Sequence, residues 1–304
     1  MRKRSLWKTA IAQRYLFLMS IPFVVWVFVF NYLPLWGWTM AFQQFKPGKS
    51  FAAQEWVGFD NFVAIFQEPQ FYLVLRNTLA MSFMGLIAGY TIPVLFAILL
   101  NEIRISAFQR TIQTISYLPH FVSWVVAAGI ITKMLSVDGI VNEMLLWLNV
   151  LDEPVQFMAK GEWFWFIVTM SDLWKEMGWN SIIFLAAISG IDPELYEAAR
   201  VDGAGRFRRM WHITLPGIRP TMMVMLILSI GWLTSIGFEK QYLLGNVLVR
   251  DYSEVLDLYV LNYGIGMGRF SFGTAVGIVN SLIAITLLLV SNWIFKRIAK
   301  ESVI

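Results

Sequence analysis

The sequence predicts an all-helical integral membrane protein with six transmembrane helices. Of its 304 residues, 58% are apolar and only 14% are charged, whereas about a quarter of the residues in a soluble domain are charged. The mean hydropathy is +0.61. The apolar residues gather in six runs, each near the length of about twenty residues that a helix needs to cross the hydrocarbon core of a bilayer.

The first predicted span covers about residues 15–36 and follows a basic segment, residues 1–14, which has five cations and no acid. A signal peptide would have a shorter apolar core and small residues at a cleavage site. Here the run ends in bulky aromatic residues between Tyr32 and Trp38, which suit a membrane interface. Residues 15–304 are therefore predicted to form one transmembrane domain, with the other spans at about residues 77–100, 117–135, 163–188, 220–238 and 272–295.

Lysine and arginine are unequally shared between the two sides of the predicted spans. With the N-terminus inside, the inner segments hold fifteen and the outer loops six. Because cytoplasmic loops carry the excess of positive charge, we expect both termini and the loop 190–219 in the cytoplasm. The net charge of +4 is thus a topology signal rather than a nucleic-acid-binding patch. The absence of cysteine and the presence of only two histidines, far apart in the chain, predict no disulfide and no metal site.

The loop between the fourth and fifth spans begins with a predicted helix over residues 193–202. Asp192 suits the N-cap and Pro193 the first helical position. Gly203 suits the C-terminal cap. Ten residues of helix extend about 15 Å, which is half of a bilayer core, so this helix lies outside the membrane.

A second short helix is predicted from Arg206 to about His212. We expect it to stop before Leu215 and Pro216, because the residue before a proline is disfavoured in the helical region. The loop would then be a helical hairpin with several arginines on its surface.

The hairpin carries the pattern E-A-A-x3-G-x9-I-x-L-P and resembles the coupling loop of ABC-importer permeases. The resemblance implies a type I (MetI-like) transmembrane domain whose cytoplasmic hairpin docks into a cleft of a separate ATPase subunit. A hairpin with a basic face toward lipid headgroups would explain the arginines but not the spacing. The residues that the resemblance assigns to coupling are Glu197, Ala198, Ala199, Arg200, Asp202, Gly203, Ile213, Leu215 and Pro216.

A wider similarity extends over nearly the whole chain. It rests on VGFDNF at 57–62, RNT at 76–78, TISYLPHFVSWVV at 114–126 and GRFRRMWHITLPGIRP at 205–220, which look like carbohydrate-uptake permeases of the LplB-like group that handle oligosaccharides from complex polysaccharides. This implies a bacterial inner or plasma membrane location, a second homologous permease in a heterodimer, two ATPase subunits and an extracellular or periplasmic sugar-binding protein. The chain has no phosphate-binding loop, so we expect it to bind no cofactor itself, with ATP and Mg on the ATPase subunits.

Three charged residues lie in the middle of the fourth predicted span: Asp172, Lys175 and Glu176. Each charge at this depth costs about 2.5–3.5 kcal/mol on insertion scales, so each needs a partner or water. Their spacing of three and four residues would let them share one helix face. They form either a translocation-path or gating cluster or a structural ion pair, and the sequence leaves both open.

Polar and aromatic residues around the end of the fifth span are further candidates. Aromatic rings beside amides and charges suit sugar binding, although aromatic side chains are also ordinary interface anchors. This group consists of Trp232, Glu239, Lys240, Gln241 and Tyr242, with Asn280 in the sixth span as a weaker candidate. The G-x-x-x-G pairs at Gly85 and Gly89 and at Gly273 and Gly277 are expected to mediate helix packing.

Two other classes of membrane protein have less support in the sequence than an ABC permease. A stand-alone secondary transporter could use Asp172, Lys175 and Glu176 as an ion or proton relay, but it has no use for the coupling hairpin. A membrane enzyme would need a nucleophile, base or metal motif, and none is present in the sequence. The hairpin therefore favours a permease that is driven by partner ATPases.

Overall fold

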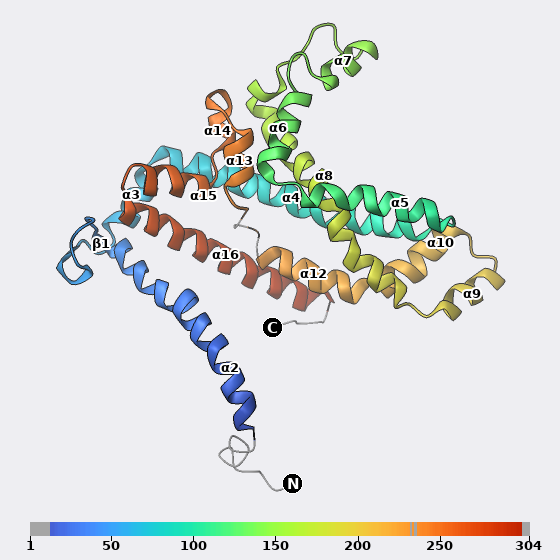
Figure 1. Cartoon of the computed structure of the whole chain (residues 1–304), viewed down its shortest axis with the longest axis horizontal. Coiled ribbons are helices and arrows are strands. Elements are labelled where there is room, and N and C mark those ends of the chain that lie inside the picture. Colours follow the sequence, from blue (N-terminus) through green and yellow to red (C-terminus); the bar gives the residue numbers. More distant parts are fainter. Residues whose placement is uncertain (1–12, 232, 234–235, 300–304) are drawn as a thin grey trace.

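The computed structural model describes residues 13–231, 233 and 236–299, and it confirms the all-helical prediction (Figure 1). The single strand pair among these residues consists of β1 (Gln43–Gln44) and β2 (Glu55–Trp56), which run antiparallel with Gln43 opposite Trp56. Of the basic segment 1–14, residues 1–12 lie outside the described part of the chain. The α-helices are α2 (Arg14–Val27), α3 (Asp60–Gln67), α4 (Pro69–Asn101), α5 (Ser106–Tyr117), α6 (Trp124–Met134), α7 (Ile140–Trp147), α8 (Gly161–Ser189), α9 (Pro193–Val201), α10 (Arg206–Arg209), α11 (Leu215–Gly217), α12 (Arg219–Gly231), α13 (Glu239–Leu244), α14 (Arg250–Ser253), α15 (Leu256–Tyr259) and α16 (Phe270–Ala299).

Shorter helical segments of other types extend or join these helices. The π-helical segments are Phe28–Tyr32, Met210–Thr214 and Val260–Gly266. The 3-10 segments are Leu33–Phe42, Phe51–Ala53, Leu118–Phe121, Phe157–Ala159 and Val247–Val249.

Three helices of the described chain are long and apolar enough to cross a membrane: Arg14–Phe42, Pro69–Asn101 and Phe270–Trp293. The number rises to five if each of two bent helix pairs is one span. α8 is also long, at 29 residues, but its three central charges make it more polar than the others. The structure thus agrees with a multi-span membrane protein and leaves six as a predicted number.

The predicted third span, residues 117–135, is not one continuous helix. The helical stretch Ser106–Phe121 meets α6 at an angle of 106°. Pro119 lacks an N–H and restricts the residue before it. Ser123 then begins a new helix, since its side chain accepts a hydrogen bond of 3.4 Å from the Val126 N–H. Because the run is mostly apolar, its hydropathy alone did not predict this break.

α4 and α8 lie side by side in the centre of the molecule, and α12 and α16 pack beside them (Figure 1). Since lipid is as apolar as the helix surfaces, close packing rather than burial from water holds such helices together. One packed cluster, Val94, Ala97, Ile98, Phe184, Ile188 and Ile218, joins α4 and α8 to the start of α12. Another, Met81, Ala128, Phe164, Val168, Leu244, Val249, Val255 and Leu258, joins α4, α6 and α8 to the segment after α13.

The first part of the helical stretch Arg14–Phe42 stands apart from this centre, whereas its 3-10 segment, Leu33–Phe42, packs on α16. α2 points away from the other helices at the lower left of Figure 1, and all its residues are exposed. Its apolar side chains, such as Phe23 at 74% exposure, therefore need lipid or another protein chain around them.

Candidate functional site

The hairpin predicted to couple to an ATPase projects from one end of the structure, at the right of Figure 1. Its first helix, α9, begins as expected: the Asp192 side chain accepts a 3.0 Å hydrogen bond from the Glu194 N–H, and Pro193 is the first helical residue. The helix ends at Val201, and Gly203 has a φ of +73°. This left-handed conformation is one that glycine adopts without steric cost.

The second helix of the hairpin does not stop before Leu215. α10 runs into the π-helical segment Met210–Thr214 and then α11, and Leu215 has helical dihedrals of −63° and −46°. The wider π turn lets the chain remain helical up to Pro216, where a regular helix would place the ring against a preceding carbonyl group. The direction changes afterwards, by 61° between Arg206–Gly217 and α12.

The base of the hairpin is fixed to the central helices. The Tyr196 hydroxyl lies 2.9 Å from the Thr214 hydroxyl, which joins the two arms. Ile218 is fully buried in the cluster that α4 and α8 share. At Gly217 an added Cβ would lie 2.6 Å from Ile191 Cδ1, so this glycine allows a close approach at the end of α8. The hairpin is thus in direct contact with the end of α8.

The surface of the hairpin combines charge with large apolar side chains. Val201 is 89% exposed and Phe207 is 83% exposed, which is expensive in water and typical of an interaction surface. Ala199, Ile213 and Leu215 are half-buried, and Leu215 packs against the cluster that α4 and α8 share. The other residues that the resemblance assigned to coupling are exposed, namely Glu197, Ala198, Arg200, Asp202, Gly203 and Pro216.

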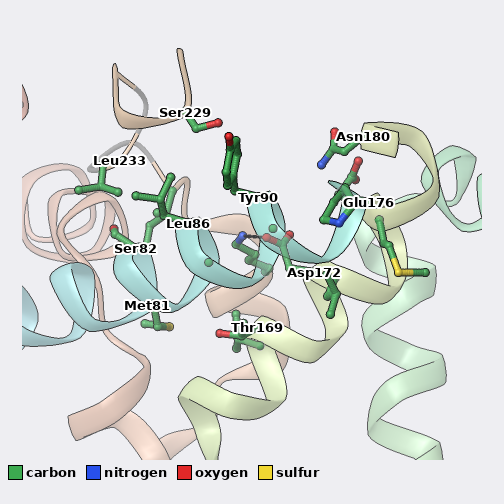
Figure 2. A pocket seen from close by; sticks show the side chains of 18 of the residues that line it. Met81, Ser82, Leu86, Tyr90, Thr169, Asp172, Glu176, Asn180, Ser229 and Leu233 are labelled. Atoms are coloured by element: carbon green, nitrogen blue, oxygen red, sulfur yellow. Dashed lines mark ion pairs between the residues drawn. The ribbon is translucent and has the colours of Figure 1, made fainter. Parts of the chain in front are cut away.

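A cavity of about 470 Å³ lies between α4, α8, α12 and α13 (Figure 2). Its wall is mixed: apolar residues alternate with hydroxyl, amide and charged groups. Two of the three central charges of α8, Asp172 and Glu176, line it, whereas Lys175 is not among the lining residues. The polar lining residues in the described chain are Ser82, Tyr90, Thr169, Asp172, Glu176, Asn180, Ser229, Lys240 and Gln241.

Asp172 is paired across the cavity rather than with its neighbours on α8. Lys240 Nζ lies 3.0 Å from Asp172 Oδ2, as the dashed line in Figure 2 marks, and both residues line the cavity. The side chains are 17% and 33% exposed. Lys240 is the only cation among the described lining residues, and the sequence did not indicate this pairing.

Lys175 does not line the cavity and is instead hydrogen-bonded within the protein. Its ammonium donates to the His120 carbonyl at 2.8 Å and to Glu176 Oε1 at 3.0 Å. The His120 carbonyl lies at the break between α5 and α6, where the regular helical partner is lost. His120 Nδ1 lies 2.7 Å from Glu176 Oε2, and the imidazole stacks on Trp179 with ring centroids 4.3 Å apart.

Two polar side chains of the cavity wall are buried without a hydrogen-bond partner. Gln241 is 1% exposed and both polar atoms of its amide are unpaired. Ser82 is 3% exposed and its hydroxyl oxygen is also unpaired. Because a buried polar group without a partner is costly, these groups are suited to the hydroxyl groups of a ligand in the cavity.

The remaining candidates lie elsewhere. Glu239 and Tyr242 are on α13 but are exposed and do not line the cavity. Asn280 is on α16, away from it, with a buried side-chain oxygen that has no partner. Trp232 lies outside the described residues. Among the described residues, no group of three His, Asp or Glu could hold a metal ion.

The G-x-x-x-G spacing in α4 predicted a helix-packing contact, but the structure places both glycines at the cavity. Gly85 and Gly89 line it, and a Cβ added at either would meet nothing within 4 Å. Their missing side chains therefore leave open space instead of bringing two helices of this chain together. Gly273 does allow a close contact, since its added Cβ would lie 2.7 Å from Gly264 Cα.

Comparisons with known proteins agree on one family. Residues 82–302 match the model described as "Binding-protein-dependent transport system inner membrane component". The chain is 42% identical over 303 residues to the polygalacturonan/rhamnogalacturonan transport system permease protein YteP of Bacillus subtilis (strain 168), with 99% of this chain and 94% of that protein covered. It is 43% identical to the protein LplB of the same organism, with 97% and 93% covered.

A solved structure is similar over the whole length. It is a chain of the bacterial alginate ABC transporter in complex with alginate pentasaccharide-bound periplasmic protein. The two chains are 38% identical, with a TM-score of 0.89 and with 99% of this chain and 100% of the other covered.

Proposed function

This chain belongs to the family of binding-protein-dependent transport system inner membrane components, and we propose that its central cavity is one half of an oligosaccharide pathway. The chain is a permease subunit of an ABC importer, in which partner ATPases supply the energy. The observation that carries the proposal is the continuous path from the cavity to the hairpin. α8 lines the cavity through Asp172 and Glu176, and its other end packs with Ile218 at the base of the hairpin.

The composition of the cavity wall supports a sugar as the ligand. A sugar ring offers an apolar face together with many hydroxyl groups, and the wall presents apolar side chains beside the unpaired groups of Gln241 and Ser82. Relatives at 42% and 38% identity are named for the transport of polygalacturonan or rhamnogalacturonan and of alginate. We therefore propose an oligosaccharide from a complex polysaccharide as the substrate.

The partners follow from the surfaces that this chain leaves exposed. A second, homologous permease would close the other side of the cavity and cover α2, all of whose residues are exposed in this chain. Val201 and Phe207 on the hairpin would contact one of two ATPase subunits, which hold ATP and Mg. A sugar-binding protein would deliver the substrate from the extracellular or periplasmic side, and both termini and the hairpin would face the cytoplasm.

A secondary transporter that relays protons through α8 has less support. In the described structure each of the three central charges has an ion-pair partner: Asp172 has Lys240, and Lys175 and Glu176 have each other. Lys175 also completes the hydrogen bonding of a helix break. This arrangement supports structural ion pairs beside a cavity rather than a proton relay.

The first test is purification of this chain from its native membrane in a mild detergent, with identification of the copurifying chains. We expect an ATPase subunit and a second permease. Reconstituted complexes should then show ATPase stimulation by a sugar-binding protein loaded with oligogalacturonides, rhamnogalacturonan fragments or arabino-oligosaccharides. Recovery of this chain alone, with transport in liposomes without ATP, would overturn the proposal.

A further inference from the structure

Two buried side chains of α4 hold the main chain of a distant segment. The Asn77 amide donates one hydrogen bond of 3.0 Å to the Asp251 carbonyl and another of 3.0 Å to the Glu254 carbonyl. The Thr78 hydroxyl accepts a bond of 2.9 Å from the Leu256 N–H. Asn77 is 0% exposed and Thr78 is 1% exposed. Bonds to the main chain fix the path of segment 251–256 whatever its side chains are.

Arg76, the residue before them, adds a third attachment. Its guanidinium donates a 2.9 Å hydrogen bond to the same Asp251 carbonyl. It also lies over the rings of Trp165 and Tyr252, at 5.4 and 5.2 Å from their centroids. The Trp165 indole N–H in turn donates to the Tyr252 carbonyl at 2.9 Å. Three consecutive residues of α4, together with α8, therefore clamp segment 251–256.

The Glu254 side chain reinforces the clamp from inside. Glu254 is 1% exposed, and a buried carboxylate needs hydrogen bonds and a cation. Gln70 donates to one oxygen at 2.9 Å, while Asn262 donates to the other at 3.1 Å. Arg250 supplies the positive charge at 3.5 Å. The segment is thus attached to α4 at its main chain and at its one buried charge.

The clamped segment also determines where α13 lies. Leu244, at the end of α13, is 2% exposed and belongs to the same packed cluster as Val249 and Val255. Gly245 approaches Ser253 so closely that an added Cβ would lie 3.1 Å from the Ser253 Cβ. α13 also packs against α15, the helix that follows the clamped segment. α13 is therefore held at its C-terminal end by residues of segment 249–255 and lies against α15.

We propose that Arg76, Asn77 and Thr78 are positioning residues of the transport cavity. By holding segment 251–256 on α4 they fix α13, and α13 places Lys240 and Gln241 in the cavity wall opposite Asp172. Their role in transport rests on the proposed function, whereas their control of the position of α13 does not. These three residues would position the substrate-contacting residues of α13 from about one helix away, without contacting the substrate themselves.

The test uses the natural absence of cysteine. Gln241→Cys is introduced into the full chain, the complex is purified with its partner chains, and the rate of reaction with a membrane-impermeant maleimide is measured on this chain. The cysteine should react slowly, because Gln241 is 1% exposed. Thr78→Val should accelerate labelling about tenfold, since it leaves the Leu256 N–H buried without an acceptor. Thr78→Ser, which keeps the hydroxyl, should not.

Asn142→Ala provides the matched control. Asn142 is also 0% exposed and also fixes a loop, through the Ser136 and Val155 carbonyls, but that loop carries no residue of the cavity. Equal labelling rates in Thr78→Val and Thr78→Ser would overturn the proposal, as would equal acceleration by Asn142→Ala. If the Thr78→Val complex is not recovered, Arg76→Gln decides, because Arg76 is exposed. Its loss removes the bonds to the Asp251 carbonyl and to Asn77 Oδ1, while the bonds from Asn77 and Thr78 to the segment remain; no acceleration then overturns the proposal.

Labelling does not depend on transport, so the two proposals can fail separately. If the labelling pattern is as expected but the oligosaccharides do not stimulate ATP hydrolysis, the positioning holds and the substrate assignment fails. If the complex transports an oligosaccharide and the pattern is absent, the positioning fails alone.

Discussion

Lys240 on α13 lies close to Asp172 on α8, with 3.0 Å between Nζ and Oδ2, and this ion pair joins α13 to the helix that leads to the hairpin. Both side chains are only partly exposed. If either residue were replaced, the other would lose its main counter-charge. Lys240 is also near the Trp124 ring, at 5.9 Å from the centroid. The pair is therefore both a part of the cavity wall and a link between two elements.

Removing either charge of this pair should impair transport, and exchanging them should restore it. Asp172→Asn or Lys240→Gln leaves one charge unpaired at the cavity, and we expect uptake to fall about tenfold, which corresponds to 1.4 kcal/mol. The double variant Asp172→Lys with Lys240→Asp keeps an ion pair and should recover most of the loss. Uptake by the double variant that is no better than that of the weaker single variant would contradict the linking role.

The hairpin should depend on the conformation of Gly203. Proline cannot adopt its φ of +73°, and a β-branched residue would be strained there by roughly 1–2 kcal/mol. Gly203→Pro or Gly203→Val should therefore abolish ATPase-driven uptake while membrane insertion continues.

Gly205→Ala is the control for this prediction. Gly205 has a φ of −66° and an added Cβ would meet nothing within 4 Å. It should leave uptake and copurification of the ATPase unchanged. Normal uptake by Gly203→Pro would show that the turn is not needed for coupling.

Lys175 should matter for assembly more than for the choice of substrate. Lys175→Met leaves the His120 carbonyl and Glu176 without the ammonium that now contacts both. Since a buried group left without its partner is strongly destabilising, we expect a lower yield and a lower melting temperature of the purified complex.

Lys133→Met serves for comparison, because it also breaks an ion pair of a lysine on a helix. Its partner Asp138 is exposed, and hydrogen bonding to Lys133 lowers the pKa of that carboxyl group to about 2. Exposed pairs contribute little to stability, so yield and melting temperature should not change. Equal effects of the two substitutions would mean that burial of Lys175 is not what makes it important.

Local spacing predicted the features that depend on neighbours in the sequence. Asp192, Pro193 and Gly203 lie where the capping rules place them. The predicted fourth span, residues 163–188, falls within the helix α8, Gly161–Ser189. These features follow from the chemistry of a few adjacent residues.

The features that the sequence did not reveal depend on contacts between distant elements. The partner of Asp172 lies on α13, and the group beside Lys175 is a carbonyl at a helix break. The cost of charge at this depth did indicate that Asp172, Lys175 and Glu176 each needed a partner or water. Which cation of the other segments would pair with Asp172 could not be predicted, since only the fold brings Lys240 to this place.

The crossing of α5 and α8 should be the most sensitive point for a small residue. At Gly178 an added Cβ would lie 2.1 Å from the Ser116 main-chain oxygen, and a main-chain atom cannot move aside as a side chain can. Gly178→Ala should therefore separate the helices and destabilise the complex by about 1–3 kcal/mol, measured as a lower melting temperature in detergent.

Gly129→Ala should have the opposite effect on the melting temperature. Gly129 lies within α6 and an added Cβ there would meet nothing within 4 Å, so alanine should stabilise the helix by about 1 kcal/mol. If both substitutions raise the melting temperature, α5 and α8 do not cross at Gly178. Because His120 follows α5 and meets Glu176 of α8, Gly178→Ala should also weaken that contact and reduce uptake, whereas Gly129→Ala should leave uptake unchanged.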